Sequence, residues 1–513
     1  MSEKETDVAR FPAFSEYASR CLYDPDFGYY SSGRVEFGKG AHFWTYPQRL
    51  RPFFGWMVAE AALRLFRAML ESGRVPHAAP LLILELGAGN GDLAADTLDY
   101  VLEHAEEPRW AGVASRLRYC IGELSASLRE RQRQRLEQHI AWGRAEVRAM
   151  NATALDFEGP FYGLVVANEL IDAFPCELFR IAADARVSRL HVKGLDADGG
   201  FLAREALWAQ LRQGKKPQMS FVEQPLELGW VTASGQLQGA PEDWLEYAQA
   251  LSPLLEDLHR AGLLPVQLCH SLELARFATG LARLLHGPER FGAALLVDYG
   301  GTSRHVLDPR SAASHLRIYG ADGALAHSSE VLHAPGEYDI TWDVDFTELA
   351  RCAMRQGLEV PFFGHQSALE QAPIELWSKR AQALLIAGRR AEGAQGMDAL
   401  LQSHELVMRF REAAGFRAMV LASPGFPFPH EYFGPSDAFA GRGLATLSLD
   451  AQRETLRLAL RQRGLPETLA DVLKTCGDPV ADLSDHRCYA LRRGVLDLLE
   501  ERGWLVDSLL GEG

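Results

Sequence analysis

Short apolar runs alternate along much of this chain with segments in which apolar residues recur at helical spacing. The apolar runs are expected to be strands, and they cover 81–86, 117–123, 145–150, 163–167 and 292–298. Runs that are apolar throughout, as at 163–167, are typical of parallel strands buried on both faces. The alternation therefore predicts an α/β fold with a mostly parallel, doubly wound sheet that helices cover on both faces.

An insertion is expected between the last two of these strands. More than a hundred residues separate 163–167 from 292–298, far more than one crossover helix needs. Within this stretch, 186–192 and 201–204 resemble two strands, and Asp-Ala-Asp-Gly-Gly at 196–200 is typical of a turn. We therefore expect an inserted subdomain that contains a β-hairpin.

Three glycines at alternate positions follow the first expected strand. Gly87, Gly89 and Gly91 lie between that strand and a helical pattern that begins at Asp92. Glycine has no Cβ, so the backbone can turn sharply there or contact a ligand. A dinucleotide site needs a glycine at the sixth position of this loop, which is Asp92 here. A nicotinamide oxidoreductase is therefore the least favoured enzyme class, and an ordinary βα loop is the alternative to a cofactor site.

Acidic residues end the first two strands, Glu85 in the first and Glu123 in the second. A strand, an acidic residue and G-x-G-x-G form the arrangement with which class I methyltransferases bind S-adenosylmethionine. The carboxyl ends of such strands meet at one rim of the sheet, where ligands bind. A carboxylate such as Glu123 can accept both ribose hydroxyls of the cofactor. The alternative is an exposed carboxylate at the end of a strand.

The fourth strand also ends in polar residues, which are candidates for binding the methyl acceptor. Glu169 and Asp172 lie three residues apart, so both can reach the cleft from one turn. We expect Glu169 to be the main carboxylate that holds the acceptor, Asn168 to lie beside the methyl group, and Asp172 and Asp298 to assist. Alternatively, Asp172 caps a helix and Asp298 accepts a hydrogen bond from a loop amide.

Residues 11 to about 420 resemble the MidA-like methyltransferases, the family that includes the mitochondrial arginine methyltransferase needed for respiratory complex I assembly. Seven motifs in the same order carry the resemblance, at 23–30, 38–47, 85–91, 122–129, 167–175, 298–300 and 335–346. In the second motif, Ala41 and His42 replace a glycine and an aspartate of the family, and Gln48 replaces a glutamate. The resemblance implies a Rossmann-like class I methyltransferase that uses S-adenosylmethionine.

The resemblance also implies an N-terminal lid and a substrate-shaping role for the insertion. After about residue 430 nothing resembles the family, and apolar residues at helical spacing predict a helical extension. The expected parts are an N-terminal lid (1–75), a first part of the core (76–180), an inserted substrate-shaping subdomain (181–285), a second part of the core (286–423) and a C-terminal helical extension (424–513). Thr45 in the lid and Asn151 after the third strand are expected to help bind the cofactor. Aromatic residues near the N-terminus are expected either to cover the sulfonium or simply to form core; they are Phe11, Tyr17, Tyr29, Tyr30, Phe43 and Trp44.

The composition and the net charge of the chain exclude some classes of partner. The chain of 513 residues is 47% hydrophobic and 24% charged, which is typical of a globular protein. Its formal charge of -15 argues against nucleic acid, which would need a basic face. No segment approaches the about 18 apolar residues of a membrane helix, and no targeting segment is recognised. The 7 cysteines and 16 histidines form no C-x-x-C or H-x-x-x-H pair, so we expect a cytoplasmic protein without a metal site.

Three functions remain compatible with the sequence. The first is an S-adenosylmethionine-dependent methyltransferase that acts on a protein arginine. The second uses the same cofactor with a small-molecule hydroxyl or carboxylate as the acceptor. The third binds the cofactor without turnover, as an assembly factor or scaffold, although the glycine loop and the carboxylates at the rim favour an enzyme. The sequence does not determine the oligomeric state.

Overall fold

The computed structural model describes most of the core of this protein. The described residues are 10–31, 51–183, 187–225, 265–301, 315–320, 325–326, 330–366, 369, 386 and 416–433. All five strands expected from the sequence fall within these ranges. Thr45, the other residues of the lid between 32 and 50, and the apolar positions expected to form helices after 433 lie outside them.

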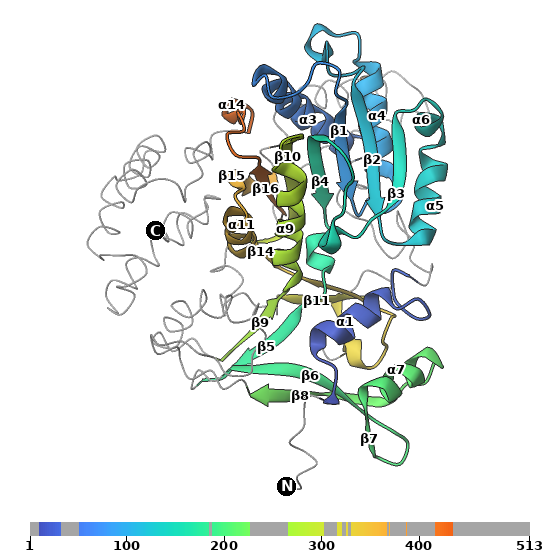
Figure 1. Ribbon diagram of the computed structural model, residues 1–513. Coiled ribbons are helices and arrows are strands. Elements are labelled where there is room, and N and C mark those ends of the chain that lie inside the picture. The colour runs from blue at the N-terminus through green and yellow to red at the C-terminus, as the bar shows by residue number, and fades with distance from the viewer. Residues whose placement is uncertain are drawn as a thin grey trace, which may run out of the picture.

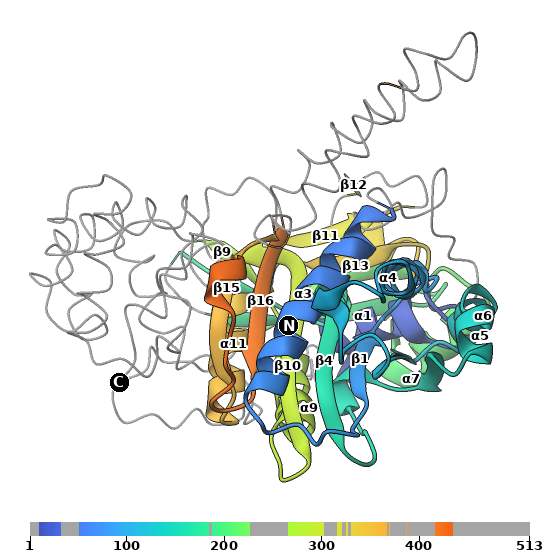
Figure 2. The same cartoon turned by 90° about the horizontal axis from the view of Figure 1, so that it is seen from above.

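The core is an eight-stranded sheet in the order β15-β16-β10-β4-β1-β2-β3, with β14 paired to the end of β10. Figure 2 shows β15, β16, β10, β4 and β1 following one another across the molecule. The parallel strands are β1 (Leu81–Leu86), β2 (Leu117–Glu123), β3 (Ala145–Ala149), β4 (Phe161–Asn168) and β10 (Arg290–Gly301), with β14 (Val344–Asp345) parallel to β10. At one edge, β16 (Phe416–Ala422) is antiparallel to β10, and β15 (Glu359–His365) is antiparallel to β16. The five expected strands are therefore confirmed.

The strand order places a crevice beside β1. The chain runs outward from β1 through β2 to β3 and then returns to the other side of β1 as β4. The connection that leaves β1 leads to one side of it, and the connection from β3 leads back to β4 on the other side, so a crevice opens outside the carboxyl ends of β1 and β4.

Helices cover both faces of the sheet. On one face, Leu81 and Ile83 of β1 pack in a cluster with α3 (Phe53–Glu71) and α4 (Asp92–Glu103). On the other face, Leu84 and Leu86 pack in a cluster with α9 (Glu273–Leu285) and α11 (Phe346–Arg355). Successive side chains of a strand point to opposite faces, so a continuously apolar strand such as β1 needs a cover on each side.

A second sheet and a short third one lie beside this core (Figure 1). The second consists of β5 (Glu177–Ile181), β6 (Val187–Leu195), β7 (Phe201–Leu202), β8 (Gln218–Pro225) and β9 (Val266–His270), with α7 (Arg204–Arg212) after β7. The expected hairpin is confirmed, because Leu195 of β6 pairs with Phe201 of β7 in antiparallel register. The third consists of β11 (Leu316–Tyr319), β12 (Leu325–Ala326) and β13 (Asp339–Trp342). Helix α1 (Phe14–Tyr23) packs against β5, β6 and β13.

Short helices complete the described structure. They are α5 (Ala126–Arg135), α6 (Glu137–Ala141), α14 (His430–Phe433), η3 (Pro108–Trp110), η4 (Ala152–Ala154), η5 (Ile171–Ala173) and η6 (Glu330–Leu332). None of the helices in the described part of the chain is long and apolar enough to cross a membrane.

Candidate functional site

A cavity of about 460 Å³ lies at the crevice outside β1 and β4. Segments that follow β1, β2 and β4 line it on the side of the main sheet. Its other walls come from residues between 23 and 31, from residues between 51 and 55 and from β13. This volume falls within the about 300–1,000 Å³ usual for sites that enclose small ligands.

The glycine loop lies at the wall of this cavity. Gly87 and Gly89 line it and have φ angles of 71° and 50°, in the left-handed region that favours glycine. A Cβ on Gly87 would lie 2.7 Å from Cδ1 of Leu170. Gly91 (φ 81°) is the N-cap of α4 and is not among the residues that line the cavity. Two of the three glycines therefore bring bare backbone to the cavity, and the third begins the helix.

Glu85 and Glu123 both line the cavity from the ends of their strands. Glu85 Oε2 accepts a hydrogen bond from the hydroxyl of Tyr119 (2.8 Å), and burial raises the Glu85 pKa to about 8. Glu123 Oε1 accepts one from the amide of Ser125 (2.8 Å), and burial raises the Glu123 pKa. The Gln132 side-chain amide donates to the Gly89 carbonyl (2.9 Å) and to Glu123 Oε2 (3.4 Å). Gln132 thus joins the glycine loop to the second strand end.

Asn168 and Glu169 line the cavity at the end of β4. Glu169 has a φ of 47° and is the one residue other than glycine with a positive φ in the described ranges. Its amide donates to the carbonyl of Val297 (2.9 Å), which fixes this conformation. Asn168 Nδ2 donates to Glu169 Oε1 (3.3 Å), whereas the buried Oδ1 of Asn168 has no hydrogen-bond partner among the described residues. Strained backbone and an unpaired buried oxygen are both features that cluster at functional sites.

Asp172 and Asp298 occupy different positions. Asp172 lines the cavity, whereas Asp298 lies outside its lining. Asp298 Oδ2 accepts hydrogen bonds from the amides of Leu170 (3.2 Å), Ile171 (2.9 Å) and Asp172 (3.3 Å). Burial raises the Asp298 pKa to about 7, although these amides oppose the rise. The structure thus places Asp298 under the loop as an acceptor for amides, the second of the two interpretations of its sequence position.

A further carboxylate, Asp339, reaches the cavity from β13. The hydroxyl of Tyr30 donates to Asp339 Oδ1 (2.8 Å), and burial raises the Asp339 pKa to about 7. The pKa of Asp172 is also raised, first by burial and then by the charges of Asp298, Asp339 and Glu169. No role was expected for Asp339 from the sequence, although it lies within the family-like motif at 335–346.

Arg51 is the only basic residue that lines the cavity in the described part of the chain. Its guanidinium contacts Asp92 (2.7 Å) and Asp96 (2.8 Å), which line the cavity near the glycine loop. The other lining carboxylates are Glu85, Glu123, Glu169, Asp172 and Asp339. The cavity therefore has an acidic lining, and a positively charged ligand would be attracted strongly where water is excluded.

Other expected site residues lie elsewhere. Asn151 is exposed, its side chain accepts a hydrogen bond from the Thr153 amide (3.0 Å), and it is not among the lining residues. Of the expected lid aromatics, Tyr30 lines the cavity, whereas Phe11, Tyr17 and Tyr29 are buried outside its lining. Phe43 and Trp44, with Ala41, His42 and Gln48, lie outside the described residues. No group of residues suited to hold a metal ion occurs in the described ranges.

Comparison with known proteins relates this fold and cavity to a family. The model of a family described as "Putative S-adenosyl-L-methionine-dependent methyltransferase" matches residues 57–364, which is more than half of the chain. No curated protein matches the chain.

Two similar solved structures come from Burkholderia thailandensis. A COG1565 superfamily member bound to S-adenosyl-homocysteine is 23% identical, with a TM-score of 0.56 over 82% of this chain and 89% of that chain. The native structure of a COG1565 superfamily protein is 22% identical, with a TM-score of 0.54 over 82% of this chain and 89% of that chain. These likenesses show the fold, and the Rossmann-like class I methyltransferase fold expected from the sequence is confirmed.

Proposed function

The chain belongs to this family of S-adenosyl-L-methionine-dependent methyltransferases, and from that premise we propose that its methyl acceptor is a protein arginine side chain. The enzyme class and the cofactor follow from the family, which favours turnover over a scaffold role. The observation that carries the choice of acceptor is the group of three carboxylates that line one part of the cavity, Glu169, Asp172 and Asp339.

The lining fits S-adenosylmethionine at the glycine loop. When bound, the cofactor would supply a methyl group on a sulfonium. An aligned acceptor nitrogen would form a bond to the methyl carbon in line as the C–S bond breaks, S-adenosylhomocysteine would be the leaving group, and the acceptor nitrogen would lose one proton. Gly87 and Gly89 would allow the backbone to contact the cofactor, because neither carries a Cβ. The Glu123 carboxylate would accept the ribose hydroxyls, and Glu85 would support it from the neighbouring strand. The unpaired Oδ1 of Asn168 offers a hydrogen-bond acceptor beside the glycine loop.

The carboxylates beyond the glycine loop suit a guanidinium. An arginine side chain stays protonated in proteins, and its planar fork of N–H donors fits carboxylates. Glu169 would be the main acceptor-holding residue, since its backbone is fixed in an unfavourable conformation at the cavity wall. Asp172 would assist, and Asp298 would position both by holding the loop amides. A carboxylate acceptor would be repelled by this lining, and a neutral hydroxyl would not offset the negative charge of the lining.

Labelled methyl transfer into a cell lysate tests the proposed acceptor. Purified protein and S-adenosylmethionine with a labelled methyl group are added to lysate from cells that lack this protein, and the product is separated into protein and small molecules. We expect labelled protein that yields methylarginine on hydrolysis. The control is Gly89→Val, in which a branched side chain occupies a left-handed glycine position at the cavity wall. Label found only in small molecules would contradict the proposal and favour a hydroxyl acceptor.

A further inference from the structure

Asp339 and Asp172 are brought to the same cavity from distant parts of the sequence. Asp339 begins β13, and β13 packs against η5, which contains Asp172. The indole N–H of Trp342 donates to the carbonyl of Phe174 (2.9 Å), which joins β13 to the segment after β4. Both carboxyls are buried, and the charge of Asp339 contributes to the raised pKa of Asp172. Two buried carboxyls so placed repel one another unless a cation or a proton lies between them.

Two tyrosines from the N-terminal segment support this pair of carboxyls. Tyr30 donates its hydroxyl hydrogen to Asp339 Oδ1 (2.8 Å). The ring of Tyr23 stacks on that of Tyr30, with centroids 5.8 Å apart, and its hydroxyl donates to the carbonyl of Ala173 (2.9 Å). Both tyrosines line the cavity. The N-terminal segment therefore fixes the carboxyl of β13 and the end of η5 with direct hydrogen bonds.

The titratable groups around Asp339 leave this part of the cavity acidic. Asp172 is a carboxyl, whereas Tyr23, Tyr29, Tyr30 and Tyr319 stay uncharged because burial raises the pKa of each hydroxyl. The cation nearby on β11 is Arg317, which lowers the Asp172 pKa but forms its ion pair with Asp343. Arg317 does not line the cavity, and the basic residue that does, Arg51, is paired with Asp92 and Asp96.

We propose that Asp339 is a third acceptor-binding carboxylate, which holds the acceptor guanidinium together with Asp172 and Glu169, and that Tyr30 is its positioning residue. This inference rests on the proposed function and adds to it the wall formed by β13 and the N-terminal segment. A guanidinium has enough N–H donors for more than one carboxylate. Its charge would offset the repulsion between Asp172 and Asp339, which a neutral acceptor would leave in place.

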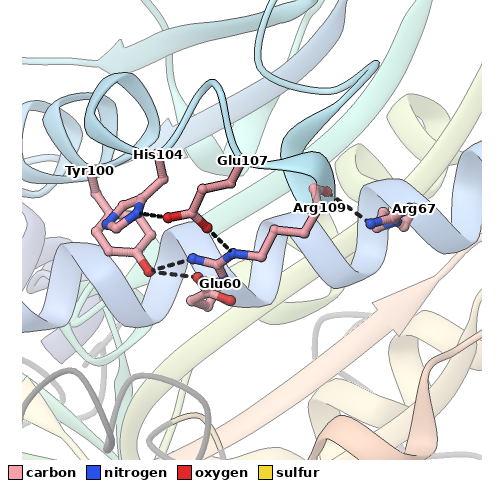
Figure 3. A network of polar contacts seen from close by, with 6 residues as sticks. All are labelled: Glu60, Arg67, Tyr100, His104, Glu107 and Arg109. Atoms are coloured by element: carbon pink, nitrogen blue, oxygen red, sulfur yellow. Dashed lines mark hydrogen bonds and ion pairs between the residues drawn. The ribbon is translucent and has the colours of Figure 1, made fainter.

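The first test replaces Asp339 with asparagine, which keeps the shape and removes the charge. We expect Asp339→Asn to lower the rate of methyl transfer to the lysate acceptor about 100-fold, while affinity for S-adenosylmethionine, measured by calorimetry, changes less than about 3-fold. Glu60→Gln is a matched control, because Glu60 is another buried carboxylate that accepts a tyrosine hydroxyl, that of Tyr100 (2.6 Å). Figure 3 shows this pair in a network with Arg109. None of these three residues lines the cavity. The control is expected to keep wild-type rate and affinity.

The second test uses the hydrogen bond from Tyr30. This bond lowers the Asp339 pKa against the effect of burial, so its loss in Tyr30→Phe should raise that pKa. We expect the acidic limb of the pH profile of methyl transfer to move to higher pH in Tyr30→Phe and to stay in place in Tyr100→Phe. If Tyr30 only supports the fold, Tyr30→Phe would lower the rate without moving the acidic limb of the pH profile.

The outcomes separate this inference from the proposed function. Label that enters a neutral small molecule would overturn the proposed function and this inference with it. If Asp339→Asn forms methylarginine at the wild-type rate, this inference is overturned and the proposed function stands. If Asp339→Asn does not fold, an unmoved acidic limb in Tyr30→Phe overturns it instead.

Discussion

Asp298 accepts a hydrogen bond from the backbone amide of Asp172, with a distance of 3.3 Å between its Oδ2 and the amide nitrogen. The same oxygen accepts the amides of Leu170 and Ile171. A buried carboxylate of β10 therefore holds the segment after β4 that carries the candidate acceptor-binding residues. Asp172, which lines the cavity, lies in η5 after β4, and Asp298, which fixes this segment, lies in β10, the parallel neighbour of β4.

Replacing Asp298 with alanine is expected to destabilise the protein. The change leaves three loop amides without their acceptor, two of them in the buried residues Ile171 and Asp172, and an unsatisfied buried donor costs about 1–3 kcal/mol. We expect the free energy of unfolding in urea to fall by at least about 2 kcal/mol in Asp298→Ala and by less in Asp298→Asn, which keeps one oxygen. Asp156→Ala, at an exposed position, is the control. Equal stability of Asp298→Ala and wild type would contradict the role of these bonds.

Replacing Glu169 with glutamine tests the charge of the main acceptor-holding residue. If the acceptor is a cation, methyl transfer should fall about 100-fold or more, which corresponds to about 2.7 kcal/mol of transition-state stabilisation. Affinity for S-adenosylmethionine, measured by calorimetry, should be retained. Loss of cofactor affinity would instead assign Glu169 to the cofactor site, and full activity would exclude a carboxylate clamp.

The left-handed backbone of Glu169 predicts a difference between two further variants. This conformation costs a residue with a Cβ about 1–2 kcal/mol, whereas glycine adopts it freely. Glu169→Gly is therefore expected to be more stable than Glu169→Ala by about 1 kcal/mol, although glycine is usually the more destabilising replacement. Both variants should lose methyl transfer. Urea denaturation measures the difference, and a less stable glycine variant would show that the strain is small.

Glu123→Ala is expected to weaken cofactor binding. A hydrogen bond to a charged group contributes about 1.5–3 kcal/mol, so the Kd for S-adenosylmethionine should rise by about 10-fold to 150-fold. Glu146→Ala, on the neighbouring strand β3 and outside the cavity lining, is the matched control. Calorimetry that finds the same Kd in both variants would remove Glu123 from the site.

Buried carboxyls predict how stability changes with pH. The pKa of Asp339 is about 7 and that of Glu85 about 8 in the folded protein, above their usual values of 3.8 and 4.5. At a pH between the usual pKa of such a group and its pKa in the folded protein, the folded state binds more protons than the unfolded state. Stability therefore falls as pH rises. The free energy of unfolding should be lower at about pH 8 than at about pH 6, by up to about 1.4 kcal/mol per proton and pH unit.

Asp339→Asn isolates one of these protons. The fall in stability with rising pH should be less steep in this variant than in the wild type, because the asparagine does not titrate. Urea denaturation of the free protein at several pH values measures both slopes. Identical slopes would show that Asp339 titrates near its usual pKa.

Features that depend on neighbouring residues could be predicted from the amino-acid sequence alone. A buried strand, the glycines after Glu85 and the helical pattern from Asp92 are contiguous, so the loop follows from local chemistry. Glu123 and Asn168 end the strands on either side of β1. Because the carboxyl ends of parallel strands meet at one rim, their presence at one cavity was predictable without a structure.

The residues that complete the cavity could be identified only once the fold was known. Asp339 and Tyr30 are separated by 309 positions, and they meet because β13 and α1 pack on each other beside η5. The positive φ of Glu169 and the buried position of Asp298 beneath the loop likewise depend on how β4 and β10 pair. Contacts of this kind are set by the packing of whole elements, and the identity of a side chain does not encode them locally. Local sequence thus specifies the strand ends at the cavity, and the packing of distant elements supplies its opposite wall.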